Sequence, residues 1–189
     1  EGTSRSTSAT TPTVSGTVWP KPRRRAWAST AGLGRRARGE SGDVRLVSLP
    51  GVFRPISDSW LLAGALEREL SAPGARTLDL CTGSGVLTIS AARCGADATA
   101  VDVSRRAVAT VRANALLNRV RVRALRGHLF DPVRGERFDV ITGNPPYVPS
   151  ADPEVPRRGA SRAWAAGHDG RIVLDEICRR ATAHLRPGG

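Results

Sequence analysis

The pattern of hydrophobic positions changes near residue 44 and then alternates between helical and strand spacing to the end of the chain. Apolar side chains in residues 57–70 recur at helical spacing, and Ser57 or Asp58 is expected to cap this helix. Short apolar runs of strand length then alternate with helical segments. The expected strands are residues 75–80, 98–103, 120–127 and 138–143, and the expected helices are residues 85–95, 104–118 and 170–185.

This alternation predicts the fold class. Strands separated by helices are joined by right-handed crossovers, which give a parallel sheet with helices on both faces. The sequence therefore predicts a doubly wound, mostly parallel α/β sheet of the Rossmann-like kind. Four strands are fewer than such a sheet usually has, the chain contains no methionine, and it ends on Pro-Gly-Gly, which normally leads into another element. We expect residues 44–189 to form a domain core that is incomplete at its C-terminus.

Residues 1–43 have a different composition, rich in serine, threonine, glycine, proline and arginine, without a sustained period. Such a segment cannot bury enough apolar surface to fold alone, so a disordered extension is expected. Its arginine-rich, acid-poor character also resembles a transit peptide or a nucleic-acid-binding arm. An extension without a role is the alternative.

Charge and cysteine content bear on partners and compartment. The chain has 29 basic and 17 acidic residues, a net charge of +12, which suits a polyanionic partner such as nucleic acid. Nearly all the basic residues are arginine, so a GC-rich coding background accounts for part of this excess. The three cysteines lack metal or disulfide spacing and are expected to be reduced, buried thiols in the cytoplasm. No apolar run is long enough to cross a bilayer, no metal site is expected, and nothing indicates an oligomeric state.

Candidate ligand-binding residues follow the first two expected strands. Ligands of open parallel sheets bind at the carboxyl ends of the strands, where Gly83 and Gly85 leave backbone amides accessible. Asp102 ends the second strand and can accept hydrogen bonds from a ribose diol. Two details favour S-adenosylmethionine over a dinucleotide. Thr88 replaces the third glycine of the dinucleotide motif, and Asp79 would repel a pyrophosphate but attract an ammonium or sulfonium group.

The stretch "ITGNPPYVPS", residues 141–150, follows the last expected strand. Asn144 brings an amide oxygen to the carboxyl edge of the sheet, and the next backbone carbonyls add acceptors. Such acceptors suit a planar NH₂ group, as in a carboxamide or in adenine, over which Tyr147 can pack. A plain Asn-Pro turn is the alternative.

Four motifs in this order, "LDLCTGSG", "AVD", "GHLFDP" and "NPPY", resemble the class I S-adenosylmethionine-dependent methyltransferases. Within them the chain resembles the short branch of the HemK-type glutamine methyltransferases of peptide-chain release factors. The resemblance implies that Asn144, Pro145, Pro146 and Tyr147 hold the substrate amide. It also implies cofactor contacts from Cys81, Thr82, Gly83, Ser84, Gly85, Asp102, Leu129 and Asn144. His128 stands where the family usually has an acidic or neutral residue.

The sequence thus predicts methyl transfer from S-adenosylmethionine to a planar amide nitrogen, in a glutamine side chain of a release factor. Two alternatives are compatible with the same residues. One is an adenine amino methyltransferase acting on RNA or DNA, and the other is a non-catalytic cofactor-binding fragment whose basic tail binds nucleic acid.

Overall fold

The computed structural model describes residues 44–70, 73–152, 154–156 and 164–189. The expected extension over residues 1–43 lies outside the described residues and stays a prediction. The helices are α1 (Ser57–Glu69), α2 (Val86–Arg93), α3 (Arg105–Leu117) and α4 (Ile172–Ala181), with short 3₁₀ turns at Asp131–Val133 and Thr182–His184. The strands are β1 (Arg76–Leu80), β2 (Asp97–Asp102), β3 (Arg123–Arg126) and β4 (Val140–Gly143).

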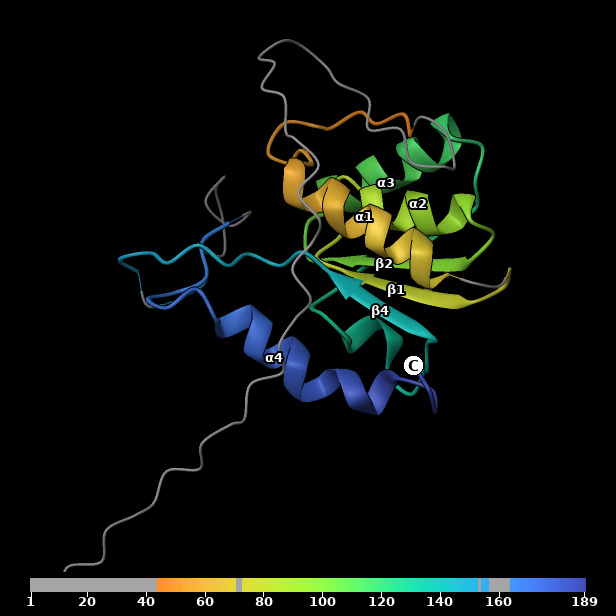
Figure 1. The fold of residues 1–189 in the computed structure, drawn as a ribbon. Coiled ribbons are helices and arrows are strands. Elements are labelled where there is room, and N and C mark those ends of the chain that lie inside the picture. The colour runs from red at the N-terminus through yellow and green to blue at the C-terminus, as the bar shows by residue number, and fades with distance from the viewer. Residues whose placement is uncertain (1–43, 71–72, 153, 157–163) are drawn as a thin grey trace, which may run out of the picture. The chain divides into compact units, whose positions relative to one another are not determined.

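The four strands form one parallel sheet in the order β3-β2-β1-β4 (Figure 1). Strand β1 lies in the interior, with Leu78 paired to Thr99 of β2 on one side and to Ile141 of β4 on the other. Because the chain moves outward from β1 to β3 and then returns to place β4 on the other side, the strand order reverses next to β1. Ligands of open α/β sheets bind at such a switch point.

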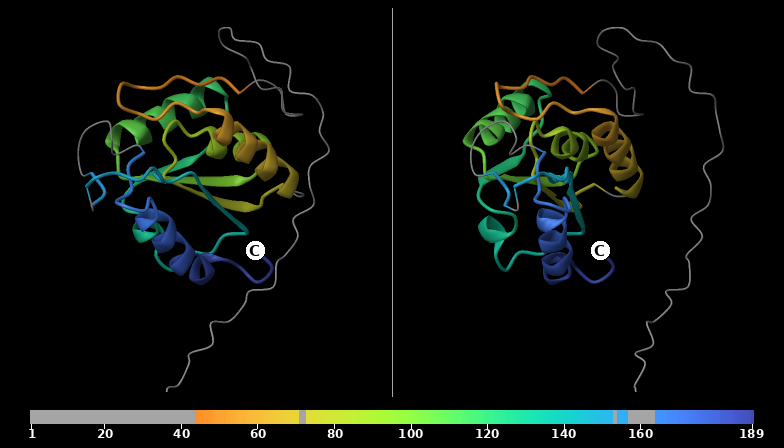
Figure 2. Two further views of the ribbon diagram at one scale, coloured as in Figure 1. Left: turned by 60° about the vertical axis from the view of Figure 1, so that its left-hand side comes forward. Right: turned by 90° about the vertical axis from the view of Figure 1, so that its left-hand side faces the viewer.

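Helices cover both faces of the sheet, as Figure 1 and the turned views of Figure 2 show. Helices α1, α2 and α3 lie on one face, where Ala63 and Leu66 of α1 pack with Val86 and Leu87 of α2. Helix α4 lies on the other face, where its Val173 joins a core cluster that includes Leu78, Leu80, Phe130 and Phe138. The predicted doubly wound, parallel α/β architecture is therefore confirmed.

Element boundaries differ from the expected ones for local reasons. Strand β3 begins at Arg123 and not near residue 120, because the Val120 N–H bonds to the Ala115 carbonyl at the end of α3 (3.0 Å). Ser104 caps α3 as predicted, accepting from the Ala107 N–H (3.4 Å). The expected cap of α1 by Ser57 or Asp58 is wrong. Ile56 is the N-cap residue without a side-chain hydrogen bond, and the Asp58 carboxylate bonds to Asn144 and Tyr147 instead.

All three cysteines are free thiols. The expectation that they are buried is wrong for Cys178, which is exposed on α4, whereas Cys81 and Cys94 are partly buried. Among the described residues, no helix combines the length and apolar character needed to span a bilayer.

Residues 44–56, which we call the strap, run across α3 toward the carboxyl edge of the sheet. Asn114 of α3 pairs with Val47 as a strand residue would, accepting from its N–H (2.8 Å) and donating to its carbonyl (2.9 Å). Asn118 pairs with the backbone of Arg45 in the same way. The amide of Asn114 also donates to the Ser84 carbonyl (2.8 Å), so this buried side chain joins the strap to the loop after β1.

Candidate active site

A cavity of about 800 Å³ opens at the carboxyl ends of β1, β2 and β4. Its volume lies in the range of small-molecule sites. One wall is formed by the strap, and the others by the loops that follow β1, β2, β3 and β4. Its lining residues include the following from the strap and the strand ends: Val52, Phe53, Ile56, Asp79, Cys81, Gly83, Asp102, Gly127, Leu129, Asn144, Pro146 and Tyr147.

The loop after β1 adopts left-handed backbone at Cys81 (φ 54°), Gly83 (φ 54°) and Gly85 (φ 84°). Gly83 lies in the cavity wall. Gly85, also predicted as a cofactor residue, does not line the cavity but packs closely against α3. A Cβ there would lie 2.9 Å from Cγ2 of Val111, so only glycine lets α3 approach this turn.

The side chains of this loop form a polar floor. Thr82 is buried and donates its hydroxyl to Asp79, while Ser84 is buried and also lines the cavity. Burial, together with the nearby carboxylates of Asp102 and Asp79, raises the pKa of the Cys81 thiol well above its usual range. Cys81 therefore stays protonated and acts as a small apolar wall residue rather than a nucleophile.

Asp79 is a buried carboxylate in the cavity wall. Its Oδ2 accepts from the hydroxyls of Thr82 (2.6 Å) and Thr88 (2.7 Å), whereas its Oδ1 is buried without a hydrogen-bond partner among the described residues. Burial raises the pKa of Asp79 to about 6, against the lowering effect of these two hydroxyls. A buried carboxylate with one unpartnered oxygen beside a cavity suits a cationic group of a ligand.

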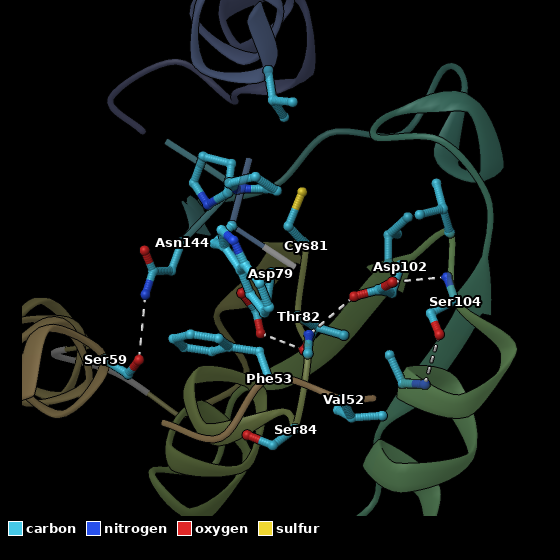
Figure 3. A pocket seen from close by; sticks show the side chains of 18 of the residues that line it. Val52, Phe53, Ser59, Asp79, Cys81, Thr82, Ser84, Asp102, Ser104 and Asn144 are labelled. Carbon is cyan, nitrogen blue, oxygen red and sulfur yellow. Dashed lines mark hydrogen bonds between the residues drawn. The ribbon is translucent and has the colours of Figure 1, made fainter. Parts of the chain in front are cut away.

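Asp102 lies at the end of β2, with both carboxylate oxygens engaged by backbone amides (Figure 3). Oδ2 accepts from the Gly83 N–H (3.0 Å), and Oδ1 accepts from the Ser104 N–H (2.8 Å). These bonds fix the carboxylate in the cavity wall, and carboxylate oxygens are acceptors for donors such as hydroxyls. Leu129, buried and with left-handed backbone (φ 41°), adds an apolar surface to the same cavity.

The predicted substrate residues follow β4 and line the same cavity. Pro145 is buried, Pro146 partly buried and Tyr147 half exposed. The Asn144 amide nitrogen donates to Oδ2 of Asp58 (3.2 Å) and to Oγ of Ser59 (3.3 Å), the second of which Figure 3 draws. The Tyr147 hydroxyl donates to the same Asp58 oxygen (2.8 Å). We call Asp58, Ser59, Asn144 and Tyr147 the Asp58 cluster.

Beyond Tyr147 the cavity mouth is largely apolar. Val148 exchanges backbone hydrogen bonds with Trp164 and Ala166, and the half-exposed Trp164 lines the mouth. The exposed side chain of His128 also lines the cavity, with its Nδ1 3.7 Å from a carboxylate oxygen of Glu176.

The structure thus brings together every predicted site residue except Gly85. Sequence reasoning missed the strap residues, of which Val52 and Phe53 line the cavity, as well as Asp58 and Ser59. The stretch "PGVFRPISDSWLL" resembles the short branch of the HemK-type family, but nothing in its sequence indicates which of its residues line a cavity. Asp58 has a weak signal, since it is a polar residue at the start of a helix shortly after a proline, but that pattern by itself predicts a helix cap. Ser59 has no signal of its own.

Comparisons with known proteins show to which family this chain is related. The family model described as "Methyltransferase small domain" matches residues 43–156. A release factor glutamine methyltransferase of Gloeobacter violaceus is 38% identical over 78% of this chain and 55% of its own length. A ribosomal protein uL3 glutamine methyltransferase of Bradyrhizobium diazoefficiens is 42% identical over 60% of this chain and 38% of its own length.

Among solved structures, the 16S rRNA N2 G1207 methyltransferase of T. thermophilus, in complex with AdoMet and guanosine, superposes with a TM-score of 0.62. It is 28% identical, and the match covers 82% of this chain and 39% of that one. The chain spans about half the length of the first curated relatives that it matches, 55% and 56%. Since the family model matches more than half of its residues, the chain belongs to the methyltransferase small-domain family and, within it, to the HemK-like class I branch.

Proposed function

We propose that this chain binds S-adenosylmethionine and transfers its methyl group to the side-chain amide nitrogen of a glutamine, in a peptide-chain release factor. One observation carries the proposal. The Asn144–Tyr147 segment lines the same cavity as Asp79 and Asp102, so acceptors for a planar amide lie in one chamber with the two carboxylates that suit the cofactor.

The residues present fit the cofactor. The unpartnered Oδ1 of Asp79 suits its ammonium or sulfonium charge, Asp102 suits the ribose hydroxyls, and Leu129 offers an apolar surface to the adenine. The cofactor, when bound, supplies an electrophilic methyl group on a sulfonium centre. Gly83 has no side chain, so its backbone in the cavity wall is open to a close approach by the cofactor.

The chain's own residues then act on the acceptor. An amide nitrogen is a weak nucleophile because its lone pair is conjugated with the carbonyl. The oxygen of Asn144 can accept a hydrogen bond from the NH₂ group, and that bond strengthens as the nitrogen gains positive character. Together with the ring of Tyr147, it would hold the planar amide in line for attack, and such positioning supplies much of the acceleration of a displacement.

The names of the relatives support glutamine as the acceptor, since those of Gloeobacter violaceus and Bradyrhizobium diazoefficiens are both glutamine methyltransferases. They act on different proteins by name, a release factor and ribosomal protein uL3. A nucleic-acid substrate is the second candidate, because the T. thermophilus neighbour is a 16S rRNA methyltransferase and the chain carries a net charge of +12. A cytoplasmic location, where translation factors act, belongs to the same proposal.

The test is to incubate the protein with isotopically labelled S-adenosylmethionine and, separately, a release factor, ribosomal protein uL3 and total RNA. Peptides and nucleosides are then analysed by mass spectrometry. Label on a release-factor glutamine is expected, and the Asn144→Ala variant serves as the inactive control. Label on uL3 would change the partner but keep the chemistry, whereas label confined to adenine or guanine would replace the proposal by the nucleic-acid reading.

A further inference from the structure

A carboxylate outside the predicted site residues bonds to Asn144 and Tyr147, which line the part of the cavity proposed to bind the substrate amide. We propose that Asp58, in the first turn of α1, is a positioning residue that orients the Asn144 carboxamide so that its oxygen faces the acceptor amide. This inference rests on the proposed function, because it assigns to Asp58 the arrangement of the groups that would bind a planar NH₂ donor.

Asp58 accepts hydrogen bonds from four donors among the described residues. Its Oδ1 accepts from the Ser59 N–H (2.6 Å) and the Ser59 hydroxyl (3.2 Å). Its Oδ2 accepts from the Asn144 amide nitrogen (3.2 Å) and the Tyr147 hydroxyl (2.8 Å). An ionised carboxylate can accept at about four lone-pair sites on its two oxygens. Asparagine has the same shape but would turn an NH₂ group toward one of these two pairs of donors, so only the carboxylate serves both.

The hydrogen bonds of Asn144 fix the orientation of its carboxamide. Both hydrogens of its amide nitrogen have acceptors, Oδ2 of Asp58 and Oγ of Ser59. If the carboxamide flipped, its oxygen would face the Asp58 carboxylate, and two acceptors would oppose each other without a proton between them. The oxygen therefore lies on the side away from Ser59, as Figure 3 shows. The charge of Asp58 decides that Asn144 presents an acceptor, and hence that the site suits an NH₂ donor.

A simpler role for Asp58 must be distinguished from this one. An acidic residue in the first turn of a helix interacts favourably with the helix dipole, and Asp58 occupies that place in α1. The dipole requires no contact with Asn144 and Tyr147, which lie 86 and 89 positions further along the chain. If the dipole were the whole role, replacing Asp58 would lower the stability of α1 and leave turnover unchanged.

The kinetic test uses Asp58→Asn, which keeps the shape of the side chain, and Glu67→Gln as a matched control on the same helix, outside the cavity. We expect Asp58→Asn to lower kcat by about tenfold to a hundredfold on the protein substrate that the wild type methylates, because the acceptor amide is then poorly oriented. Affinity for S-adenosylhomocysteine, measured by calorimetry, should stay within about twofold, because in the described part of the chain Asn144 is the one predicted cofactor residue that bonds to Asp58 and the other predicted contacts do not involve it. Glu67→Gln should resemble the wild type. Wild-type kcat for Asp58→Asn would overturn the proposal.

A double-mutant cycle asks whether Asp58 acts through Asn144. In an Asn144→Ala background there is no carboxamide to orient, so adding Asp58→Asn should lower single-turnover rates by less than about threefold. If the two losses multiply in full, Asp58 acts independently of Asn144 and the proposal is wrong. Thermal unfolding and cofactor affinity of each variant identify any that fails to fold.

A spectroscopic test needs no substrate. Tyr147 is the one tyrosine in the sequence, so the absorbance of phenolate reports on it alone. Its hydrogen bond to Asp58 raises the pKa of Tyr147 above its ordinary value. Asp58→Asn should lower the titration midpoint, and Glu67→Gln should not. An unshifted midpoint overturns the contact and the proposal with it.

If the wild type methylates RNA and not glutamine, the proposed function fails, and the kinetic comparison of the same variants is made on that substrate.

Discussion

The buried carboxylate of Asp79 makes the stability of the protein depend on pH in an unusual direction. Its pKa rises from an ordinary value of 3.8 to about 6, chiefly because of burial, and the nearby Asp102 adds to the rise. Because the folded-state pKa lies above the unfolded value, the contribution of Asp79 to the free energy of unfolding is fully present below pH about 4 and is lost as pH rises through about 6. At about 1.4 kcal/mol for each pH unit, the loss amounts to ~3 kcal/mol.

The perturbation that isolates this contribution is Asp79→Asn, which cannot titrate. Other carboxylates act in the opposite direction. A hydrogen bond from Arg123 holds the pKa of Glu136 below its ordinary value, and one from Arg180 does the same for Asp131. The contribution of these carboxylates to stability is therefore lost as pH falls. The difference in unfolding free energy between wild type and Asp79→Asn cancels those effects. We expect urea unfolding to show that difference moving by ~3 kcal/mol between pH 4 and pH 8, to the disadvantage of the wild type.

The cofactor should reverse this dependence. A cationic group beside Oδ1 of Asp79 stabilises the ionised carboxylate, so the wild type should bind S-adenosylhomocysteine about tenfold more tightly above pH 7 than near pH 5. Asp79→Asn should bind with a weaker and nearly constant affinity. A stability difference that stays constant within about 0.5 kcal/mol across this range would refute the reasoning, because Asp79 would then titrate as an exposed carboxylate does.

Three further predictions concern single positions. Asp102→Ala should weaken S-adenosylhomocysteine binding by about 1.5–3 kcal/mol in calorimetry, because ribose hydroxyls lose a charged acceptor; an unchanged affinity would place the ribose elsewhere. Asn144→Ala should lower turnover by roughly a hundredfold to a thousandfold while cofactor affinity falls only modestly, and wild-type turnover would reduce "NPPY" to a turn. Gly85→Ala should lower the unfolding free energy by about 1–3 kcal/mol, since its backbone is left-handed (φ 84°) and a Cβ would lie 2.9 Å from Val111; unchanged urea unfolding would contradict the packing role.

The fold could be predicted from the sequence because its signals are local. Each strand is a short apolar run, each helix has its own period, and the parallel order follows from their alternation. The position of the ligand site follows from the same order, since Asp79, Asp102 and Asn144 all stand at strand ends. These residues can be found from the sequence alone, because the ends of the strands mark their positions.

The remaining parts of the site depend on contacts between distant segments. Gly85 looks like Gly83 in sequence, and only the close approach of Val111 shows that it serves packing. Asp58 looks like a helix cap, and only the return of the chain after β4 brings Asn144 to it. Such pairings leave no trace in periodicity or composition, because neither partner is unusual in its own surroundings.

The Asp58 cluster closes a much longer loop than the cofactor-binding residues do. Asp102 meets Gly83 across 19 positions, whereas Asn144 meets Asp58 across 86. Loop closure costs more entropy as the loop lengthens, and residues emerge from the ribosome in order, so the glycine loop and Asp102 can assemble before β4 is synthesised. A nascent chain that has reached Leu129 already carries the expected cofactor contacts apart from Asn144. The ability to hold an acceptor amide is then the last property of the cavity to form, and among its hydrogen bonds those of Asn144 should be among the first to open in native-state exchange.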